Sequence, residues 1–249
     1  MKIAYNSVIG KVRDKNEDAV GTFKNQQGVV LALLSDGIGG NKAGEVASQL
    51  VVTNLGNNFA NTDLASIKAA QAWLDRELNK VNDVILTESH TDMNLKGMGT
   101  TFVAALVAGE DGFIANIGDS RGYLFSNNHL QQVSEDHSYV NELIKTGNLT
   151  PDEAKNNPYK NIITKSLGIN DASTADYMGF QLQDQDQILL CSDGLTNMVD
   201  DQTIAEVLGE PLSVKEKCEK LITLANDKGG LDNITVLIMN YESAGDVDE

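Results

Sequence analysis

The feature that most constrains the fold of this chain is the order of its extended and helical segments. Residues 28–35 form a nearly continuous apolar run, which is typical of a central strand covered on both faces. Two helical stripes follow directly, over residues 43–55 and 67–85. The later elements expected are two hairpins with turns at Glu110-Asp111-Gly112 and Asn127-Asn128, strands over 188–192 and 234–239, and helices over 203–208 and 214–225. Because strands come in hairpins and helices in consecutive pairs, the pattern predicts an α+β fold with antiparallel sheets and segregated helices.

The segment after the second hairpin has a different character. Residues 136–167 are polar and contain Pro151 and Pro158, so we expect a small helical insertion over one edge of a sheet. Residues 1–241 are expected to form a single domain, because 249 residues suit one large domain and no repeat or low-complexity stretch divides them. The acidic residues 242–249 are expected to be a disordered tail.

The charge of the chain excludes one class of partner. The 36 acidic residues outnumber 19 Lys and Arg residues, which gives a formal net charge of −17, and no basic face of the kind that nucleic-acid binders carry is visible. No apolar run is long enough for a transmembrane helix, and the N-terminus is unlike a signal peptide. Cys191 and Cys218 fall in apolar patterns typical of reduced core residues. We therefore expect a cytoplasmic monomer that binds neither nucleic acid nor membrane.

Four aspartates stand where apolar segments meet turns. Asp36 follows LALLS, Asp119 follows IANIG, Asp193 follows ILLCS, and Asp232 precedes ITVLI. A single aspartate in such a place is usually a turn residue or a helix cap. Four that converge would repel one another at the rim of the core, and a bound cation is the usual means of neutralising such a cluster. The pattern therefore favours a metal site.

The types of donor indicate which cation to expect. An oxygen-only ligand set selects a hard ion, Mg²⁺ or Mn²⁺, over zinc. His90, His129 and His137 show no zinc-type spacing and are expected to be surface or loop residues. Two such ions about 3.5–4 Å apart can share a hydroxide and direct it at phosphorus. Gly37 and the glycines after it would let backbone carbonyls and a bulky ligand approach the ions.

Eight segments of the chain resemble motifs of one enzyme family, the metal-dependent serine/threonine protein phosphatases of type 2C in their compact bacterial form. In order they are RDKNEDA, SDGIGGNKAGEVAS, GMGTT, ANIGDSRGYLF, SEDHSYVNELIKTG, NIITKSLG, CSDGLTNM and GGLDNITV. They extend from residue 13 to residue 236, nearly the whole chain. A single piece such as SDG is weak, but eight in the right order are very specific.

The resemblance implies a fold and an activity. The fold is a four-layer αββα sandwich, with two central antiparallel sheets flanked by helix pairs and a flap over about residues 138–165 beside the cleft. The activity is hydrolysis of phosphoserine and phosphothreonine in proteins by a hydroxide that bridges two Mg²⁺ or Mn²⁺ ions. The partners implied are phosphorylated proteins and a cognate bacterial serine/threonine kinase that the phosphatase opposes.

The resemblance also implies roles for the aspartates. Asp36 would bridge the two ions, with the Gly37 carbonyl on one of them. Asp193 and Asp232 would bind the second ion. Asp119, together with Asp193, would hold a third ion often seen in bacterial members.

Three residues of the RDKNEDA segment receive supporting roles from the resemblance. Arg13 would hold the substrate phosphate, a task that its planar guanidinium fork suits. Glu17 and Asp18 would orient metal-bound waters. The chain departs from the family pattern at Ile38 and Asn41, which replace the usual Met and His, so acid–base chemistry at position 41 is in doubt.

Two other functions remain open on the sequence. A metal-dependent phosphodiesterase or nuclease would use the same two-ion chemistry, but the acidic composition weighs against it. A catalytically inactive regulatory domain of the same fold is the other alternative. Retention of all four aspartates and of Arg13 weighs against that one.

Overall fold

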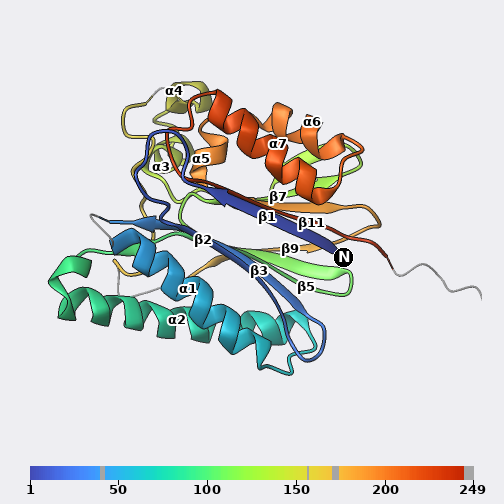
Figure 1. Cartoon of the computed structure of the whole chain (residues 1–249), viewed down its shortest axis with the longest axis horizontal. Helices are drawn as coiled ribbons and strands as arrows, with labels where there is room; N and C mark the ends of the chain where they lie inside the picture. The colour runs from blue at the N-terminus through green and yellow to red at the C-terminus, as the bar shows by residue number, and fades with distance from the viewer. Residues whose placement is uncertain (40–42, 156, 170–173, 244–249) are drawn as a thin grey trace, which may run out of the picture.

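The protein is described here from a computed structural model that covers residues 1–39, 43–155, 157–169 and 174–243. Two antiparallel sheets lie face to face, and helices cover the outer face of each (Figure 1). The predicted α+β class and the αββα sandwich are therefore confirmed. No helix in the described part of the chain is long and apolar enough to cross a membrane.

One sheet holds five strands and the other holds six. The first has the order β1 (Lys2–Val8), β11 (Ile234–Asn240), β10 (Gln187–Cys191), β7 (Arg121–Ser126), β8 (His129–Gln132). The second has the order β2 (Asp18–Lys24), β3 (Val30–Ile38), β5 (Phe102–Ala108), β6 (Asp111–Ile117), β9 (Asp176–Gln181), with the short β4 (Gly99–Thr100) paired to β3.

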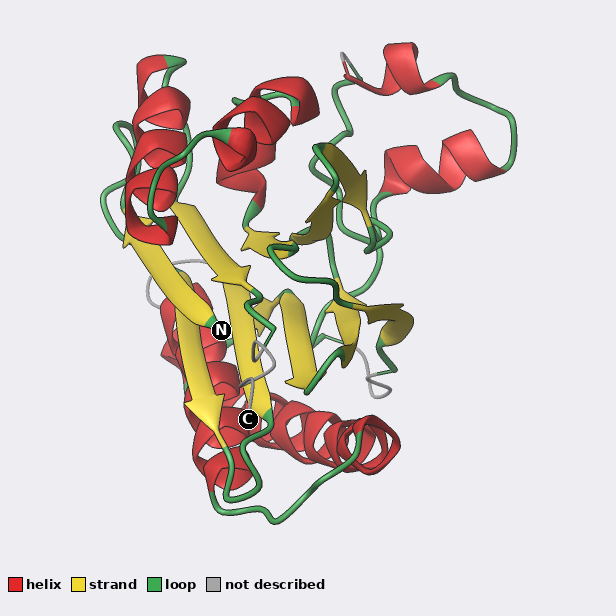
Figure 2. Ribbon diagram, turned by 90° about the vertical axis from the view of Figure 1, so that its right-hand side faces the viewer, coloured by secondary structure: helices red, strands yellow, loops and turns green. Residues whose placement is uncertain are grey.

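The two predicted helix pairs are present, and the short helix at residues 193–196, which is not predicted, precedes the second pair. On the second sheet lie α1 (Ala43–Ala60) and α2 (Ile67–Thr91), followed by the 3₁₀ turn η1 (Met93–Leu95). On the first sheet lie α5 (Asp193–Thr196), α6 (Asp201–Gly209) and α7 (Val214–Asp227). The inserted segment forms α3 (Tyr139–Lys145) and α4 (Pro151–Lys155), which stand away from the sheets at the upper right of Figure 2.

Strand β3 shows why its sequence is continuously apolar. Leu31 and Leu33 belong to the cluster that packs against α1 and α2. Ala32 and Leu34 alternate with them and belong to the cluster between the two sheets. A third cluster lies under α6 and α7. A strand buried on both faces has no polar face to display, so its sequence reads as one apolar run.

Apart from the two-residue β4, three strands are not predicted from the sequence, and all three lie at sheet edges. β1 borders the first sheet, and β2 and β9 border the second. Their residues are mostly half-buried or exposed, so the apolar alternation that marks a strand is weak in them. The sequence signal follows burial, which is smallest at an edge.

The two predicted hairpins are present, with one correction. Asn127 and Asn128 both have positive φ, 51° and 61°, as the two central residues of a type I′ turn require. In the other hairpin the predicted turn at residues 110–112 is wrong, because Ala108 pairs with Asp111 and the turn is Gly109-Glu110. Asp111 and the glycine after it are already part of β6.

Candidate active site

The polar end of the layer between the sheets carries the first group of predicted site residues. Asp36 continues the row of Ala32 and Leu34 on β3, and Asp18 stands opposite it in the β2–β3 register. The backbone of Asp36 is fixed, since its N–H donates to Thr101 Oγ1 at 2.9 Å. Strand alternation therefore places both carboxylates where the apolar interior ends.

The Asp18 carboxylate bridges the two sheets. Its Oδ2 accepts hydrogen bonds from Ser192 Oγ at 2.8 Å and from Thr235 Oγ1 at 2.6 Å. Ser192 follows β10 and Thr235 lies in β11, so both donors come from the opposite sheet. The other oxygen, Oδ1, is buried without a hydrogen-bond partner. The sequence analysis assigns Asp18 a role but misses both hydroxyl donors.

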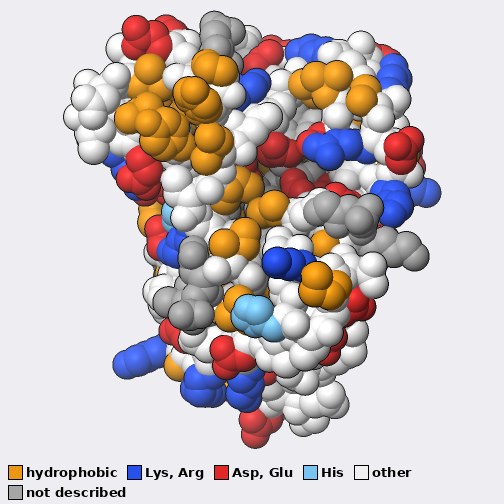
Figure 3. Space-filling model, turned by 90° about the vertical axis from the view of Figure 1, so that its left-hand side faces the viewer, with side chains coloured by type: hydrophobic (Ala, Val, Ile, Leu, Met, Phe, Trp, Pro, Cys, Tyr) orange, Lys and Arg blue, Asp and Glu red, His pale blue; other side chains and the backbone are white. Residues whose placement is uncertain are grey.

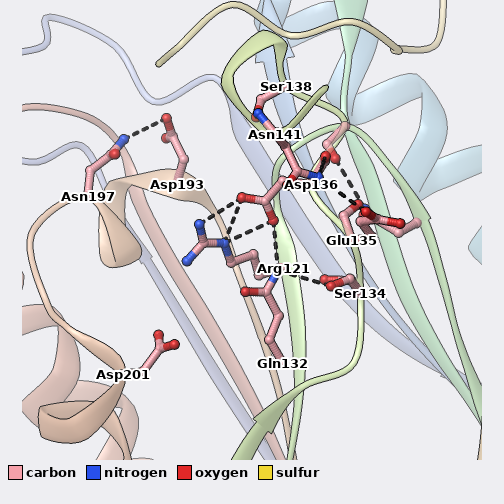
Figure 4. Close-up of polar contacts among 12 residues, drawn as sticks. Arg121, Gln132, Ser134, Glu135, Asp136, Ser138, Asn141, Asp193, Asn197 and Asp201 are labelled. Carbon is pink, nitrogen blue, oxygen red and sulfur yellow. Dashed lines mark hydrogen bonds and ion pairs between the residues drawn. The ribbon is translucent and has the colours of Figure 1, made fainter. Parts of the chain in front are cut away.

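Asp193 and Asp119 lie on the flap side of this cluster. Asp193 begins α5, and its Oδ2 accepts from Asn197 Nδ2 at 2.9 Å (Figure 4). Its Oδ1 is buried without a partner, as in Asp18. Asp119 follows Gly118, which has φ of 109° and no room for a Cβ, since that atom would lie 2.7 Å from the Thr101 side chain. The turn that presents Asp119 therefore requires glycine.

Asp232 and Arg13 lie on the other side of the cluster. Arg13 Nη2 contacts Asp232 Oδ2 at 2.6 Å. Asn233 holds the loop that carries Arg13 and Glu17 through two hydrogen bonds. Its Oδ1 accepts from Glu17 N–H at 2.8 Å, and its Nδ2 donates to the Lys15 carbonyl at 2.7 Å. The sequence analysis misses Asn233, although its place between Asp232 and the β11 strand is a usable signal.

Glu17 and Gly37 meet at the start of α1. The Gly37 N–H donates to the Glu17 carbonyl at 3.1 Å. A Cβ on Gly37 would lie 2.2 Å from the Gly44 carbonyl oxygen, and one on Gly44 would lie 3.0 Å from the Glu17 carboxyl carbon. The two glycines thus allow the end of β3, the start of α1 and the Glu17 carboxylate to lie in direct contact.

Burial and mutual repulsion raise the pKa values of the clustered carboxyls. Burial first, and then Asp193 and Asp232, raise the pKa of Asp18 to about 7 despite the two hydroxyl donors. Burial and Asp193 raise the pKa of Asp119 to about 8, and burial and Asp232 raise the pKa of Asp193 to about 6. The pKa of Asp36 rises well above its usual range, through burial and then Asp18 and Asp193. The four carboxyls are thus close enough to interact strongly, and each holds its proton to a higher pH than an isolated aspartate does.

The residues fit a hard divalent cation. Asp18 and Asp193 each leave a buried carboxylate oxygen without a donor, which is costly unless a cation satisfies it. All the donors are oxygens, the type that Mg²⁺ and Mn²⁺ prefer. As they stand, no three His, Cys, Asp or Glu side chains among the described residues are arranged to hold a metal ion. Repulsion between the carboxylates opposes their closer approach until a cation offsets it.

A cleft of about 720 Å³ opens from Asp119 and Asp193 toward the flap. Figure 3 shows acidic side chains gathered in a hollow on this end of the molecule, with hydrophobic side chains on the lobe beside it. On the cleft wall, Arg121 Nη2 contacts Asp136 Oδ2 at 2.7 Å and Arg121 Nε donates to both Asp136 oxygens at 3.0 Å (Figure 4). The sequence analysis misses this pair, although both residues fall within the quoted motifs.

The structure thus brings together Asp36, Asp119, Asp193, Asp232, Asp18 and Arg13, with Glu17 and Gly37 beside them. Asn41 lies outside the described residues. His137 is a loop residue, as the expectation of a surface or loop position allows, and only 6% of its surface is exposed. Two backbone contacts and two ring contacts hold it inside, as described below.

Comparisons with known proteins agree on one family. Residues 11–228 match the family model for protein phosphatase 2C. The serine/threonine phosphatase stp of Listeria welshimeri is 43% identical over 240 residues, which cover 96% of this chain and 95% of the relative. The solved structure of the S. agalactiae serine/threonine phosphatase has a TM-score of 0.93 at 39% identity, covering 97% of this chain and 99% of that one. The catalytic domain of the protein phosphatase PstP, solved with two manganese ions, has a TM-score of 0.84 at 37% identity, covering 95% and 96%. The chain belongs to the protein phosphatase 2C family and is a protein serine/threonine phosphatase.

Proposed function

We propose that this chain removes phosphate from phosphoserine and phosphothreonine in proteins with the help of two bound Mg²⁺ or Mn²⁺ ions. One observation carries the proposal. Half-buried carboxylates converge at the polar end of the inter-sheet layer, and two of them, Asp18 and Asp193, each leave a buried oxygen without a donor. The manganese-bound PstP structure supports the choice of ions.

The clustered residues divide into ion ligands. Asp36 would bridge the two ions. The Gly37 carbonyl would bind the first ion, and Asp193 and Asp232 would bind the second. Asp119 with Asp193 would hold a third ion. When bound, the ions would supply a bridging hydroxide as nucleophile and the positive charge that offsets the phosphoryl oxygens.

Arg13 is placed to receive the substrate phosphate. Its guanidinium is half-exposed and contacts Asp232, and we expect a phosphate oxygen to replace this carboxylate when substrate enters. Its planar fork can donate two parallel hydrogen bonds to phosphate oxygens. The Asp232 carboxylate released in this exchange becomes free to face an ion, which links substrate binding to completion of the ligand set.

Asp18 and Glu17 would orient water around the ions. Asp18 is held through Oδ2 by Ser192 and Thr235, so its free Oδ1 has a fixed direction. Glu17 lies between the start of α1 and the Arg13 loop, where burial is the largest of the effects that raise its pKa. A carboxyl group that can hold or release a proton near the site suits the ordering of water.

We also infer the setting of the enzyme. Residues 1–241 would act as one catalytic unit, since both sheets supply site residues. Free, buried Cys191 and Cys218 support a cytoplasmic location, where a monomer would oppose a cognate serine/threonine kinase. The acidic tail proposed for residues 242–249 falls mostly outside the described residues.

The decisive experiment measures phosphate release from a phosphothreonine peptide with Mn²⁺, with Mg²⁺ and after exhaustive chelation. We expect turnover only with an added ion, none in Asp36→Asn, and wild-type turnover in Asp63→Asn, which removes an exposed acid elsewhere. Bis-p-nitrophenyl phosphate, tested in parallel, distinguishes a phosphodiesterase. Substantial turnover after chelation, or a preference for the diester, would overturn the proposal.

A further inference from the structure

The start of the flap is joined directly to the residue that precedes Asp119. The backbone N–H of His137 donates to the Gly118 carbonyl at 2.9 Å. In return, the N–H of Gly118 donates to Nδ1 of the His137 ring at 3.0 Å. One residue therefore holds both peptide groups of Gly118, and the second of these peptides leads into Asp119. Since a fixed peptide plane fixes the direction of the following side chain, His137 has the means to orient the Asp119 carboxylate.

This contact also defines the tautomer of the His137 ring. A backbone N–H can only donate, so Nδ1 must carry a lone pair. The ring proton then lies on Nε2, which donates to Asp176 Oδ2 at 3.1 Å. The other oxygen of Asp176 accepts from Lys165 Nζ at 3.0 Å. Asp176, the first residue of β9, thereby holds both ends of the flap against the edge of the second sheet.

The root of the flap, residues 136–138 and 163–165, is held by hydrogen bonds within itself and to the neighbouring strand β7. The two chain segments that enter and leave it pair with each other, through Ser138 and Ile163 and through a 2.9 Å bond from Thr164 N–H to the His137 carbonyl. The neighbouring Asp136 is held by the Arg121 guanidinium (Figure 4). The flap root is therefore connected to the site through hydrogen bonds, so a displacement of the root can reach Asp119.

We propose that His137 is a positioning residue for Asp119, and that its ring couples the flap root, anchored at Asp176 and Lys165, to the metal site. The inference rests on the metal role proposed above for Asp119. A displacement of the flap root changes the direction of the Asp119 carboxylate and so its affinity for an ion. By linkage, an ion held at Asp119 stiffens the flap root to the same extent.

Two substitutions separate the two halves of this connection. His137→Asn keeps an acceptor near the position of Nδ1 but does not reach Asp176. His137→Gln carries an amide donor toward Asp176 but lacks the acceptor for Gly118. His90→Gln is the control, because His90 is exposed in the last turn of α2 and outside this network.

Hydrogen–deuterium exchange of the metal-free protein measures the Gly118 contact and the Asp176 contact separately, and it does not depend on enzyme activity. We expect the Gly118 amide to exchange faster in His137→Gln and to stay near wild type in His137→Asn. The flap amides of α3 should show the reverse. Uniformly faster exchange over the whole chain in both variants would mean that His137 acts only through general packing, and would overturn the proposal.

Manganese dependence tests the connection to Asp119. His137→Gln should raise the Mn²⁺ concentration for half-maximal activity by about tenfold, the lower end of the range for residues that orient metal ligands. His137→Asn keeps the contact with Gly118 but loses the one with Asp176, so it should raise the Mn²⁺ requirement less than His137→Gln does.

A double-mutant cycle with Asp119→Ala completes the test. If His137 acts through Asp119, His137→Gln has little further effect on Mn²⁺ requirement in the Asp119→Ala background. An equal effect in both backgrounds would overturn the coupling. If Asp119→Ala by itself leaves the Mn²⁺ requirement unchanged, the metal role of Asp119 fails instead, while exchange at Gly118 still decides whether His137 holds that peptide.

Discussion

At the scale of single residues, the site is a set of carboxylates that the fold brings close enough together to repel one another. One oxygen of Asp193 has a donor in Asn197 and the other has none. Stability and function make opposite demands on such a residue. Removing its charge relieves repulsion in the metal-free protein but removes an ion ligand from the enzyme.

Asp193→Asn is therefore expected to abolish turnover without lowering metal-free stability. The amide has nearly the same shape, and it carries no charge to repel Asp232. Thermal unfolding in EDTA at pH 8 should show a midpoint equal to or above that of wild type, with each kcal/mol of relieved repulsion worth about 2–4 °C in a chain of this size. A lower midpoint would show that Asp193 is needed for the fold. Asp63→Asn serves as the control for loss of one acidic charge at the surface.

Arg13→Ala is expected to raise KM for a phosphopeptide and leave kcat nearly unchanged. A phosphate held equally in the ground state and the transition state is uniform binding, and its loss appears in KM. A charged hydrogen bond contributes about 1.5–3 kcal/mol, so the rise should be roughly tenfold or more. Lys11→Ala removes an exposed positive charge from the same loop and is the matched control. A fall in kcat at constant KM would assign Arg13 to the transition state instead.

At the scale of elements, close packing around glycines positions the strands that carry Asp18 and Asp36. Helix α1 packs on β2 and β3, and its Gly56 lies against the Phe23 ring of β2. A Cβ at Gly56 would lie 2.0 Å from Phe23 Cζ. The distance between helix and sheet is therefore set by the absence of one side chain.

Gly56→Ala decides between helix propensity and packing. Propensity alone favours alanine in a helix by about 1 kcal/mol. Overpacking a core site costs about 1–3 kcal/mol, and here the obstacle is the partly buried Phe23 ring, which packs against the core cluster, so we expect net destabilisation. Gly179→Ala is the control, because the nearest atom to its added Cβ is 3.9 Å away. Urea unfolding of both variants measures the difference, and a stabilised Gly56→Ala would show that Phe23 moves aside freely.

At the scale of the whole molecule, the acidic cluster makes stability depend on pH and on metal. The folded-state pKa values of Asp18, Asp119 and Asp193, about 7, 8 and 6, lie above the value of about 4 for an unfolded aspartate. For a raised pKa, the contribution to stability is present at low pH and is lost as pH rises through the folded value. The metal-free protein should therefore lose stability from about pH 4, the pKa of an unfolded aspartate, up to about pH 8, the highest of the three folded values.

Thermal unfolding in EDTA across that pH range tests this expectation. The midpoint should fall with rising pH, and the slope should be smaller in Asp193→Asn. Saturating Mn²⁺ should restore stability most strongly at the high-pH end, since an ion bound only by the folded state stabilises it by mass action. A metal-free midpoint that rises with pH throughout would contradict the raised pKa values.

The sequence by itself determined which strongly buried segments form helices and strands. It also determined which four aspartates are candidate metal ligands. The run over β3 and the stripes of α1, α2, α6 and α7 are visible because local periodicity records which face is buried. Asp36, Asp119, Asp193 and Asp232 are visible because each interrupts such a pattern beside turn-forming residues. Eight ordered motifs then identify the family and, with it, the sandwich.

Only the tertiary structure decided which distant groups satisfy these residues. Ser192 and Thr235 donate to Asp18 across 174 and 217 residues of sequence, and no local pattern encodes that pairing. The edge strands β1, β2 and β9 are not predicted because they bury few side chains. His137 is expected from the sequence to be a surface or loop residue, and only the packing of the whole chain places it between the Gly118 turn and β9. Local sequence fixes which side of an element is apolar, whereas contacts between elements depend on how the whole chain packs.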